Sequence, residues 1–259
     1  MPKTIRKPLI AALTLFLSAS ASAAQAQESE GGQNENHIAV GLGFVDQHTL
    51  FNAASTQTSL LPLISIKQGA FYFETAEAGF HLEEEMVDIS PSLDLFVAAR
   101  SPQGRDRKKL SVDAGLRVSL DTQMGKLSGE FRHDVTDKFN GSEIIARYSY
   151  PISIGRFTIT PAVQASWLDR KAANYMYGVT VAQRARMIRK ERRVILPVAP
   201  ITDEALNLGG DISMAVQLNK RLMLIAVVGA TYLDKSIHRS AAIDQKWEAQ
   251  STLGLTYRF

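Results

Sequence analysis

Side chains that could do acid–base, nucleophilic or metal chemistry are spread thinly along this 259-residue sequence. Its five His residues lie far apart, at positions 37, 48, 81, 133 and 238, and it has no Cys. The lack of Cys excludes disulfides, thiolate metal sites and a cysteine nucleophile. A His–Ser hydrolase needs the pair at hydrogen-bond distance with a third orienting group, and the sequence has no local signature of one. Phosphate loops, nucleotide fingerprints and carboxylate metal loops are also missing from the sequence. We therefore predict no catalytic residue, no metal and no cofactor, and a protein that is not an enzyme.

Charged residues with regular spacing are the second candidate for function. Asp121 and Lys126 flank a short turn, and if they pair across it, Arg117 lies opposite Glu130. One register of the next hairpin would also put Arg147 opposite Glu130. Opposite charges directly across a ladder contribute about 0.2–1 kcal/mol per pair. We interpret the row as an ion-pair network that fixes strand register. The alternative, a selectivity ring for a solute, would favour one sign of charge, whereas both signs alternate here.

Strands are needed to position such a row, and the sequence alternates with a period of two. In segment 110–120, six apolar residues share one face and polar residues share the other. Segments 126–135, 156–167 and 247–259 follow the same pattern, with full charges on one face only. This alternation is typical of strands and not of helices. Beyond residue 26 no segment has a sustained helical period, so we predict an all-β chain.

The direction of the apolar face separates two kinds of barrel. A soluble barrel buries that face, whereas an outer-membrane barrel turns it toward lipid and keeps a polar interior. Short and long connections alternate along the chain, and aromatic residues gather near strand ends, as in membrane barrels. The sequence closes on Leu253, Leu255, Tyr257 and Phe259, which resembles the C-terminal signal of outer-membrane barrels. We predict a single antiparallel transmembrane β-barrel whose apolar rows face outward and whose ionic rows line the interior.

The strand count requires one element that the alternation does not reveal clearly. A bacterial barrel with both termini in the periplasm has an even number of strands. An inward strand is missing between 70–76 and 91–99, and Gly79–Glu85 is the candidate for it. We predict about 12 strands, with 10 as the alternative. The eleven clear segments are 37–45, 59–67, 70–76, 91–99, 110–120, 126–135, 142–150, 156–168, 209–218, 222–233 and 247–259.

The first 26 residues have the three parts of a secretory signal peptide. Three cations precede the apolar run Leu9–Leu17, and small residues end in Ala24-Gln25-Ala26. We predict cleavage before Gln27, a polar periplasmic lead-in over 27–36 and the barrel over 37–259; the alternative is a retained anchor. The formal charge of +3 falls to zero without this segment, because it carries three cations and no acid. Nucleic acid is therefore not an expected partner.

A basic run lies in the long connection 170–208, which we expect on the outer side of the membrane. Its six cations face one acid, Glu191, and give a local charge of +5. Arg side chains match phosphate geometry, so one interpretation is a contact with the phosphates of lipopolysaccharide in the outer-membrane lipid. The alternative is a solvated loop. The cations are Arg184, Arg186, Arg189, Lys190, Arg192 and Arg193.

Several separated segments, in order along the mature chain, resemble the MltA-interacting protein MipA/OmpV family of Gram-negative outer-membrane proteins. They are 40–43, 61–65 followed by Phe71 and Phe73, 104–106, 175–180 and 254–259. The resemblance implies a scaffold that brings a murein lytic transglycosylase together with a bifunctional murein synthase, and it carries no catalytic residues.

Two departures from the family pattern, at 182–193 and at Ser236-Ile237, lie in expected outer loops. They therefore weaken the inference of any loop function from the family more than they weaken the inference of its fold. A narrow passive channel or permeability protein is the alternative function, because the predicted interior is polar.

Overall fold

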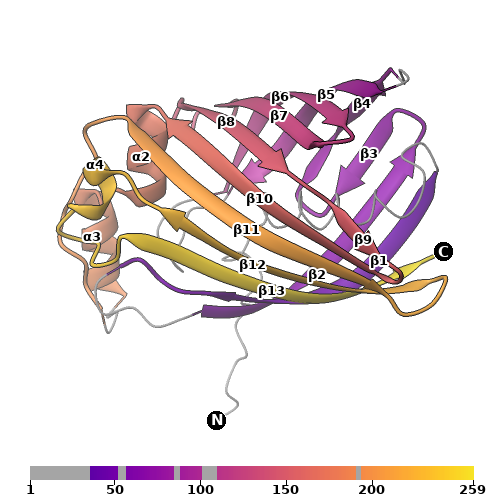
Figure 1. Cartoon of the computed structure of the whole chain (residues 1–259). Helices are drawn as coiled ribbons and strands as arrows, with labels where there is room; N and C mark the ends of the chain where they lie inside the picture. The colour runs from indigo at the N-terminus through magenta and orange to yellow at the C-terminus, as the bar shows by residue number, and fades with distance from the viewer. Residues whose placement is uncertain (1–35, 52–56, 85–87, 101–109, 191–193) are drawn as a thin grey trace, which may run out of the picture.

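The computed structural model describes residues 36–51, 57–84, 88–100, 110–190 and 194–259. Their strands form one antiparallel sheet that closes on itself, because β11 pairs with both β10 and β12 (Figure 1). The strands are β1 (His37–Gln47), β2 (Gln57–Gln68), β3 (Phe71–Glu74), β4 (Glu77–Glu83), β5 (Ile89–Arg100), β6 (Ser111–Thr122), β7 (Gly125–Asp134), β8 (Ser142–Ser149), β9 (Ile152–Ile154), β10 (Phe157–Leu168), β11 (Ala205–Gln217), β12 (Leu222–Tyr232) and β13 (Trp247–Arg258). The predicted signal peptide and most of the 27–36 lead-in lie outside the described residues.

The wall has the twelve strands that we predicted, because β8 and β9 are two parts of one strand. Both pair with β10: β8 pairs over residues 162–168 and β9 over residues 157–159. Pro151 lies between β8 and β9 and has no N–H to donate to a ladder, which explains the interruption.

The missing inward strand is β4, which covers most of the predicted 79–85 segment and starts two residues earlier. It pairs with β3 on one side and β5 on the other. β3 and β4 are the shortest of the full wall strands and are joined by a tight turn, in which Thr75 has a φ of 44°. The barrel wall is therefore shorter at this hairpin than at the other strands.

The apolar rows face outward, as predicted. Val118, Leu127 and Phe131 are exposed on the outer surface, whereas Glu130 and Arg132 are buried on the inside. In a bilayer this exposed apolar band is covered by acyl chains. Among the described residues, no helix is long and apolar enough to cross a membrane.

The expectation of an ionic interior holds for one side of the barrel only. On β1 and β2 the inward side chains Val45, Leu61 and Leu63 form an apolar cluster. A Cβ at Gly254 would lie 2.6 Å from a methyl carbon of Leu63, so the glycine makes room for this leucine. Met223, Ile225 and Val227 continue the apolar side on β12. The interior therefore has an apolar half and an ionic half.

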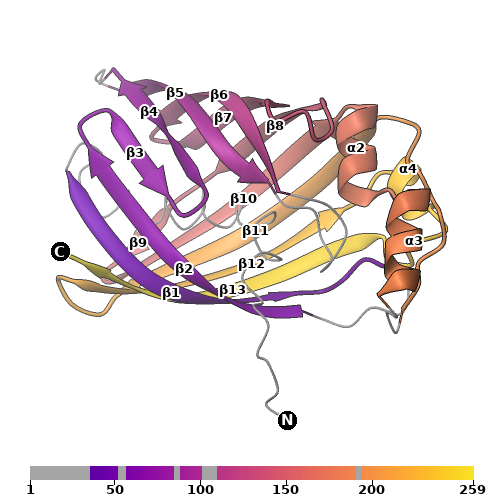
Figure 2. The ribbon, with the colours of Figure 1, turned by 180° about the vertical axis from the view of Figure 1, so that it is seen from behind.

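Three short helices, which we did not predict, lie at the end of the barrel away from the C-terminus (Figures 1 and 2). They are α2 (Arg170–Tyr177), α3 (Val181–Arg189) and α4 (Lys235–His238). We call this the outer end; the opposite, inner end carries the short turns and Phe259. The helices have eight, nine and four residues, too few for a helical period to stand out in the sequence.

The helices and adjoining segments pack around an apolar cluster of their own, which we call the outer cap. Local signals start the helices: Asp169 caps α2, and Thr180 forms a capping box with Gln183 at α3. The buried apolar members of the outer cap are Leu50, Phe51, Leu168, Ala172, Ala173, Tyr177, Val179, Met187, Leu196, Ala199, Ile201, Ala205, Leu233, Ile237, Ala242 and Ile243.

Candidate functional site

The ionic half of the interior is centred on Arg117 of β6. Its Nε lies 2.7 Å from Glu130 on β7, and the structure places these two residues opposite each other, in the register we expected. Its other nitrogens lie 3.0 Å from Glu77 on β4 and 3.3 Å from Asp94 on β5. One guanidinium therefore ties together strands β4, β5, β6 and β7.

A second guanidinium, that of Arg132, joins the same carboxylates. It forms an ion pair with Glu130 and lies 3.9 Å from Glu77. The Phe96 ring lies under both cations, with centroid distances of 4.7 Å to Arg117 and 5.3 Å to Arg132. Cations placed over a ring face are attracted by its quadrupole. We call these residues, together with Tyr72 and His81, the Arg117 network. Its members are Tyr72, Glu77, His81, Asp94, Phe96, Arg117, Glu130 and Arg132.

Glycine creates the space for the ring inside the Arg117 network. A Cβ at Gly115 would lie only 2.2 Å from the Phe96 ring. No real Cβ approaches an aromatic carbon that closely, so any side chain at this position would push the ring away from the two cations.

The Arg117 network also holds a histidine and a tyrosine that we did not single out from the sequence. Nδ1 of His81 lies 2.5 Å from Asp94, and the Tyr72 hydroxyl donates to Glu77 at 2.8 Å. His81 and Glu77 are on the inward face of β4, the strand that alternation identified least clearly. The register of that strand with β5 was the missing signal, because it places His81 opposite Asp94.

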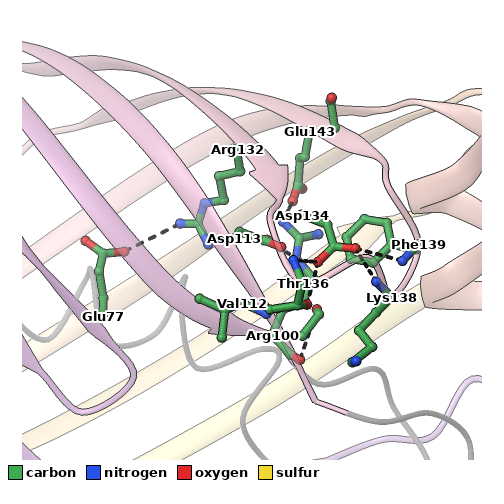
Figure 3. Close-up of polar contacts among 12 residues, drawn as sticks. Glu77, Arg100, Val112, Asp113, Arg132, Asp134, Thr136, Lys138, Phe139 and Glu143 are labelled. Atoms are coloured by element: carbon green, nitrogen blue, oxygen red, sulfur yellow. Dashed lines mark hydrogen bonds and ion pairs between the residues drawn. The ribbon is translucent and has the colours of Figure 1, made fainter.

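A second ionic group lies closer to the outer cap, as Figure 3 shows. Arg100 contacts Asp113 at 2.5 Å and Glu143 at 2.7 Å. Glu143 also accepts a hydrogen bond of 2.8 Å from Ser166. Because Arg100 is on β5 and Glu143 is on β8, this contact bridges strands that do not neighbour each other.

Asp134, at the end of β7, fixes the loop that leads to β8. Its carboxylate accepts hydrogen bonds from the backbone N–H groups of Thr136, Lys138, Phe139 and Asn140, at 2.7–3.0 Å (Figure 3). A carboxylate that satisfies four N–H groups determines how far the chain advances before the next strand begins.

The predicted row does not extend from Glu130 to Arg147, and this part of our prediction was wrong. Glu130 lies opposite Ile145, and Arg147 lies opposite Ser128. A shift of this size keeps every side chain on the same face, so alternation cannot detect it. Arg147 instead binds Asp211 of β11, at 2.7 and 2.9 Å. We did not predict this pair from the sequence.

The basic run forms much of α3. Arg184, Arg186, Arg189 and Lys190 are exposed, whereas Gln183 and Met187 face the outer cap. Arg192 and Arg193 lie outside the described residues.

The structure also contains two His–Ser contacts that we did not predict. His37 lies 3.0 Å from Ser65, and Nδ1 of His133 lies 2.9 Å from Ser142. The His133 pair is on the outward face of the wall, where a hydrolytic water is not expected. Within the described part of the chain, no three His, Asp or Glu side chains are arranged to hold a metal ion.

Ionisable groups of the outer cap have shifted proton affinities. Burial raises the pKa of the Tyr177 hydroxyl well above its usual value, and the nearby Glu248 carboxylate acts in the same direction. Burial alone would raise the pKa of Asp234 too, but hydrogen bonds from Ser236 hold it below its usual value. Tyr177 therefore stays protonated, and Asp234 stays ionised at neutral pH.

Comparison with known proteins identifies the family. The profile of the family described as MltA-interacting protein MipA matches residues 40–259. The chain belongs to this family. It is 23% identical to the MltA-interacting protein of Escherichia coli K12, a match covering 86% of this chain and 89% of that protein. It is 21% identical to the putative outer membrane protein YiaT of the same strain, with 86% and 92% covered. It is 24% identical to the outer membrane protein OmpV of Vibrio cholerae, with 60% and 58% covered. The protein is thus an outer-membrane β-barrel of the MipA/OmpV family.

Proposed function

We propose that this barrel is a non-catalytic anchor that holds a murein lytic transglycosylase at the periplasmic side of the outer membrane. In the same proposal it acts as an adaptor that brings the transglycosylase together with a bifunctional murein synthase. The name of one relative, MltA-interacting protein, supports the first partner. The proposal assigns the role to a binding surface, so it requires a partner-facing patch at the inner end.

The observation that carries this proposal is the apolar character of the inner rim. Met124, in the turn between β6 and β7, is 76% exposed, and Phe259 is 76% exposed. Leu218, in the turn between β11 and β12, is also exposed. Exposed apolar side chains at this rim can be buried in a protein interface. We therefore place the partner contact on these residues.

Binding of a soluble transglycosylase domain to the purified barrel tests the proposal. Met124→Asp should weaken binding at least tenfold, because a carboxylate would then be desolvated in the interface. Val181→Asp is the matched control, since Val181 is 71% exposed on α3 at the opposite end. Failure of the unaltered barrel to bind, or equal loss in both variants, would reject the proposal.

A narrow channel remains the competing function, and the ionic half of the interior favours it. The pairing of cations with carboxylates there argues for a structural role, because a selective pore would present one sign of charge. Planar-bilayer recordings distinguish the two. Reproducible open-channel steps from purified protein would favour the channel, and silence together with transglycosylase binding would favour the anchor.

We also propose that α3 contacts the phosphates of lipopolysaccharide. Three exposed cations in α3, a fourth at its C-cap Lys190, and the absence of any acid within Val181–Arg189 support this. Replacing Arg184 and Arg189 by Glu should lower the salt-sensitive part of lipopolysaccharide binding. Unchanged binding at low ionic strength would show that α3 is only a solvated helix.

Export through a cleaved signal peptide completes the proposal. Residues 1–26 would be removed, leaving 27–36 as a periplasmic lead-in ahead of the barrel. N-terminal sequencing of protein from outer membranes should begin at Gln27, and a sequence beginning at Met1 would mean a retained anchor.

A further inference from the structure

The outward face of the barrel has a groove of about 770 Å³ that crosses five strands and reaches a sixth. It starts beside His48 at the outer end of β1 and ends at Tyr148 on β8. Small residues make up its floor: Ala249, Ala230 and Gly210, from β13, β12 and β11. Most of the lining is apolar and lies on the face that the bilayer covers.

Strand register shows that the groove follows one continuous row. The N–H of His48 donates to Ala249, and Ala249 is paired with Ala230, which is paired with Gly210. Gly210 is paired with Val163, and Val163 with Tyr148. The row therefore runs perpendicular to the strands, across five inter-strand steps.

Larger side chains form both banks of the groove. Toward the outer end the next outward row contains Trp247 and Tyr232, whose rings meet edge to face at 5.0 Å. Toward the inner end the next row contains Val228 and Ile212, both strongly exposed. Tyr and Trp side chains mark the membrane interface. The groove thus begins just below the interface of the outer leaflet.

The row descends from the outer end of the wall toward its inner end. Five steps of about 4.8 Å make roughly 24 Å. With strands tilted about 40° from the membrane normal, a perpendicular row descends about 15 Å. The far end of the row reaches the inner side of the wall, because Tyr148 is paired with Leu127, two residues from the start of β7 at Gly125, and its hydroxyl donates to the backbone oxygen of Met124 in the β6–β7 turn. An acyl chain that enters at headgroup height would therefore occupy the outer part of the floor, over Ala249, Ala230 and Gly210.

We propose that this groove is a binding site for an acyl chain of lipopolysaccharide. A channel one side-chain row wide fits a single hydrocarbon chain, whereas the convex wall of a second barrel would rest on the banks and leave the floor empty. The polar end fits as well, because Asp46 and His48 face outward there, and Asp46 accepts a hydrogen bond from Thr58 at 2.8 Å. The lipid headgroup would meet polar atoms at this end, and the acyl chain would meet apolar atoms along the rest of the groove.

The site differs from the α3 contact in its physical basis, so the two can be separated. At 1 M salt the Debye length is about 3 Å, and a phosphate–arginine contact at the surface is largely screened. Burial of an acyl chain is not weakened by salt. The inference also stands without the transglycosylase proposal, since the groove is on the lipid-facing wall.

The proposal is tested by measuring how much lipopolysaccharide stays bound to the barrel after mild detergent extraction at 1 M salt. Native mass spectrometry would count the lipopolysaccharide molecules per barrel. Ala230→Leu fills the floor and should lower this number at least fivefold. Ala226→Leu is the matched control, because Ala226 faces outward on the same strand, four residues away and outside the groove. It should retain as much lipopolysaccharide as the unaltered barrel.

Three results would overturn the proposal. The first is equal retention by Ala230→Leu and the unaltered protein, and the second is no retention by the unaltered protein. The third is an unaltered barrel that is dimeric and becomes monomeric in Ala230→Leu without losing lipid, which would make the groove an interface between copies. If Ala230→Leu shows no heat-dependent gel shift and has therefore not folded, Ala249→Leu fills the neighbouring floor position and is judged by the same criteria.

Discussion

Replacing Arg117 by Leu is the most direct perturbation of the interior, because this side chain contacts three carboxylates. Removing one member of a buried ion pair costs about 3–5 kcal/mol, since the partner charge stays buried without compensation. Each carboxylate keeps at least one other partner: Glu130 keeps Arg132, Asp94 keeps His81, and Glu77 keeps the Tyr72 hydroxyl and Arg132. We therefore expect the lower end of that range, about 3 kcal/mol.

The assay is reversible unfolding in guanidinium chloride of the barrel reconstituted in lipid vesicles. Arg156→Leu serves as control, because Arg156 is exposed at an inner turn, and it should change the free energy of unfolding by about 0.5 kcal/mol or less. A double-mutant cycle with Glu130→Leu should give a coupling energy of at least about 1 kcal/mol, as contacting charges do. A cost below about 1 kcal/mol for Arg117→Leu, or additive effects in the cycle, would refute the reasoning.

Three further predictions concern single positions. Gly115→Ala should destabilise the barrel by about 1–3 kcal/mol in the same assay, because the new Cβ displaces the Phe96 ring. Asp134→Ala should cost at least about 2 kcal/mol and increase hydrogen exchange in the following loop, since four N–H groups lose their acceptor. Asp234→Ala should cost about 1 kcal/mol at pH 7. Folding lowers the pKa of Asp234, so the variant should show its whole loss in free energy of unfolding above about pH 4. The difference between the variant and the unaltered protein should vanish as the pH falls further.

Alternation in the sequence predicted the parts of the fold that depend on a period of two. It located the strands, the outward apolar face and the need for a twelfth strand near Gly79. The Asp121–Lys126 turn also placed Arg117 opposite Glu130, because a tight turn leaves little freedom of register. The register of β7 with β8, which the 135–141 loop sets, could not be predicted from alternation. It depends on how the Asp134 carboxylate gathers backbone N–H groups, and this produces no periodic signal.

The outer cap and the apolar half of the interior were missed for other reasons. α2 and α3 are too short to show a period, although the Asp169 and Thr180 caps were readable as helix starts. β12 is apolar on both faces, so its sequence does not distinguish inside from outside. The Arg147–Asp211 pair joins residues 64 positions apart, which only the closed barrel brings together.

The position of the Arg117 network favours a structural role over ion selectivity. β2 pairs with β3 over only four residues, and β3 pairs with β4 over four, so this is where the ladder has fewest hydrogen bonds. The end of the hairpin is held at both sides: the N–H of Thr75 donates to Ile64 at 2.8 Å, and that of Ala99 donates to Ala76 at 2.8 Å. Glu77, directly after this turn, receives both guanidiniums from β6 and β7. Side-chain charges therefore reinforce the wall where backbone pairing is weakest, and loss of Arg117 should raise hydrogen exchange in β3 and β4 before any other strand.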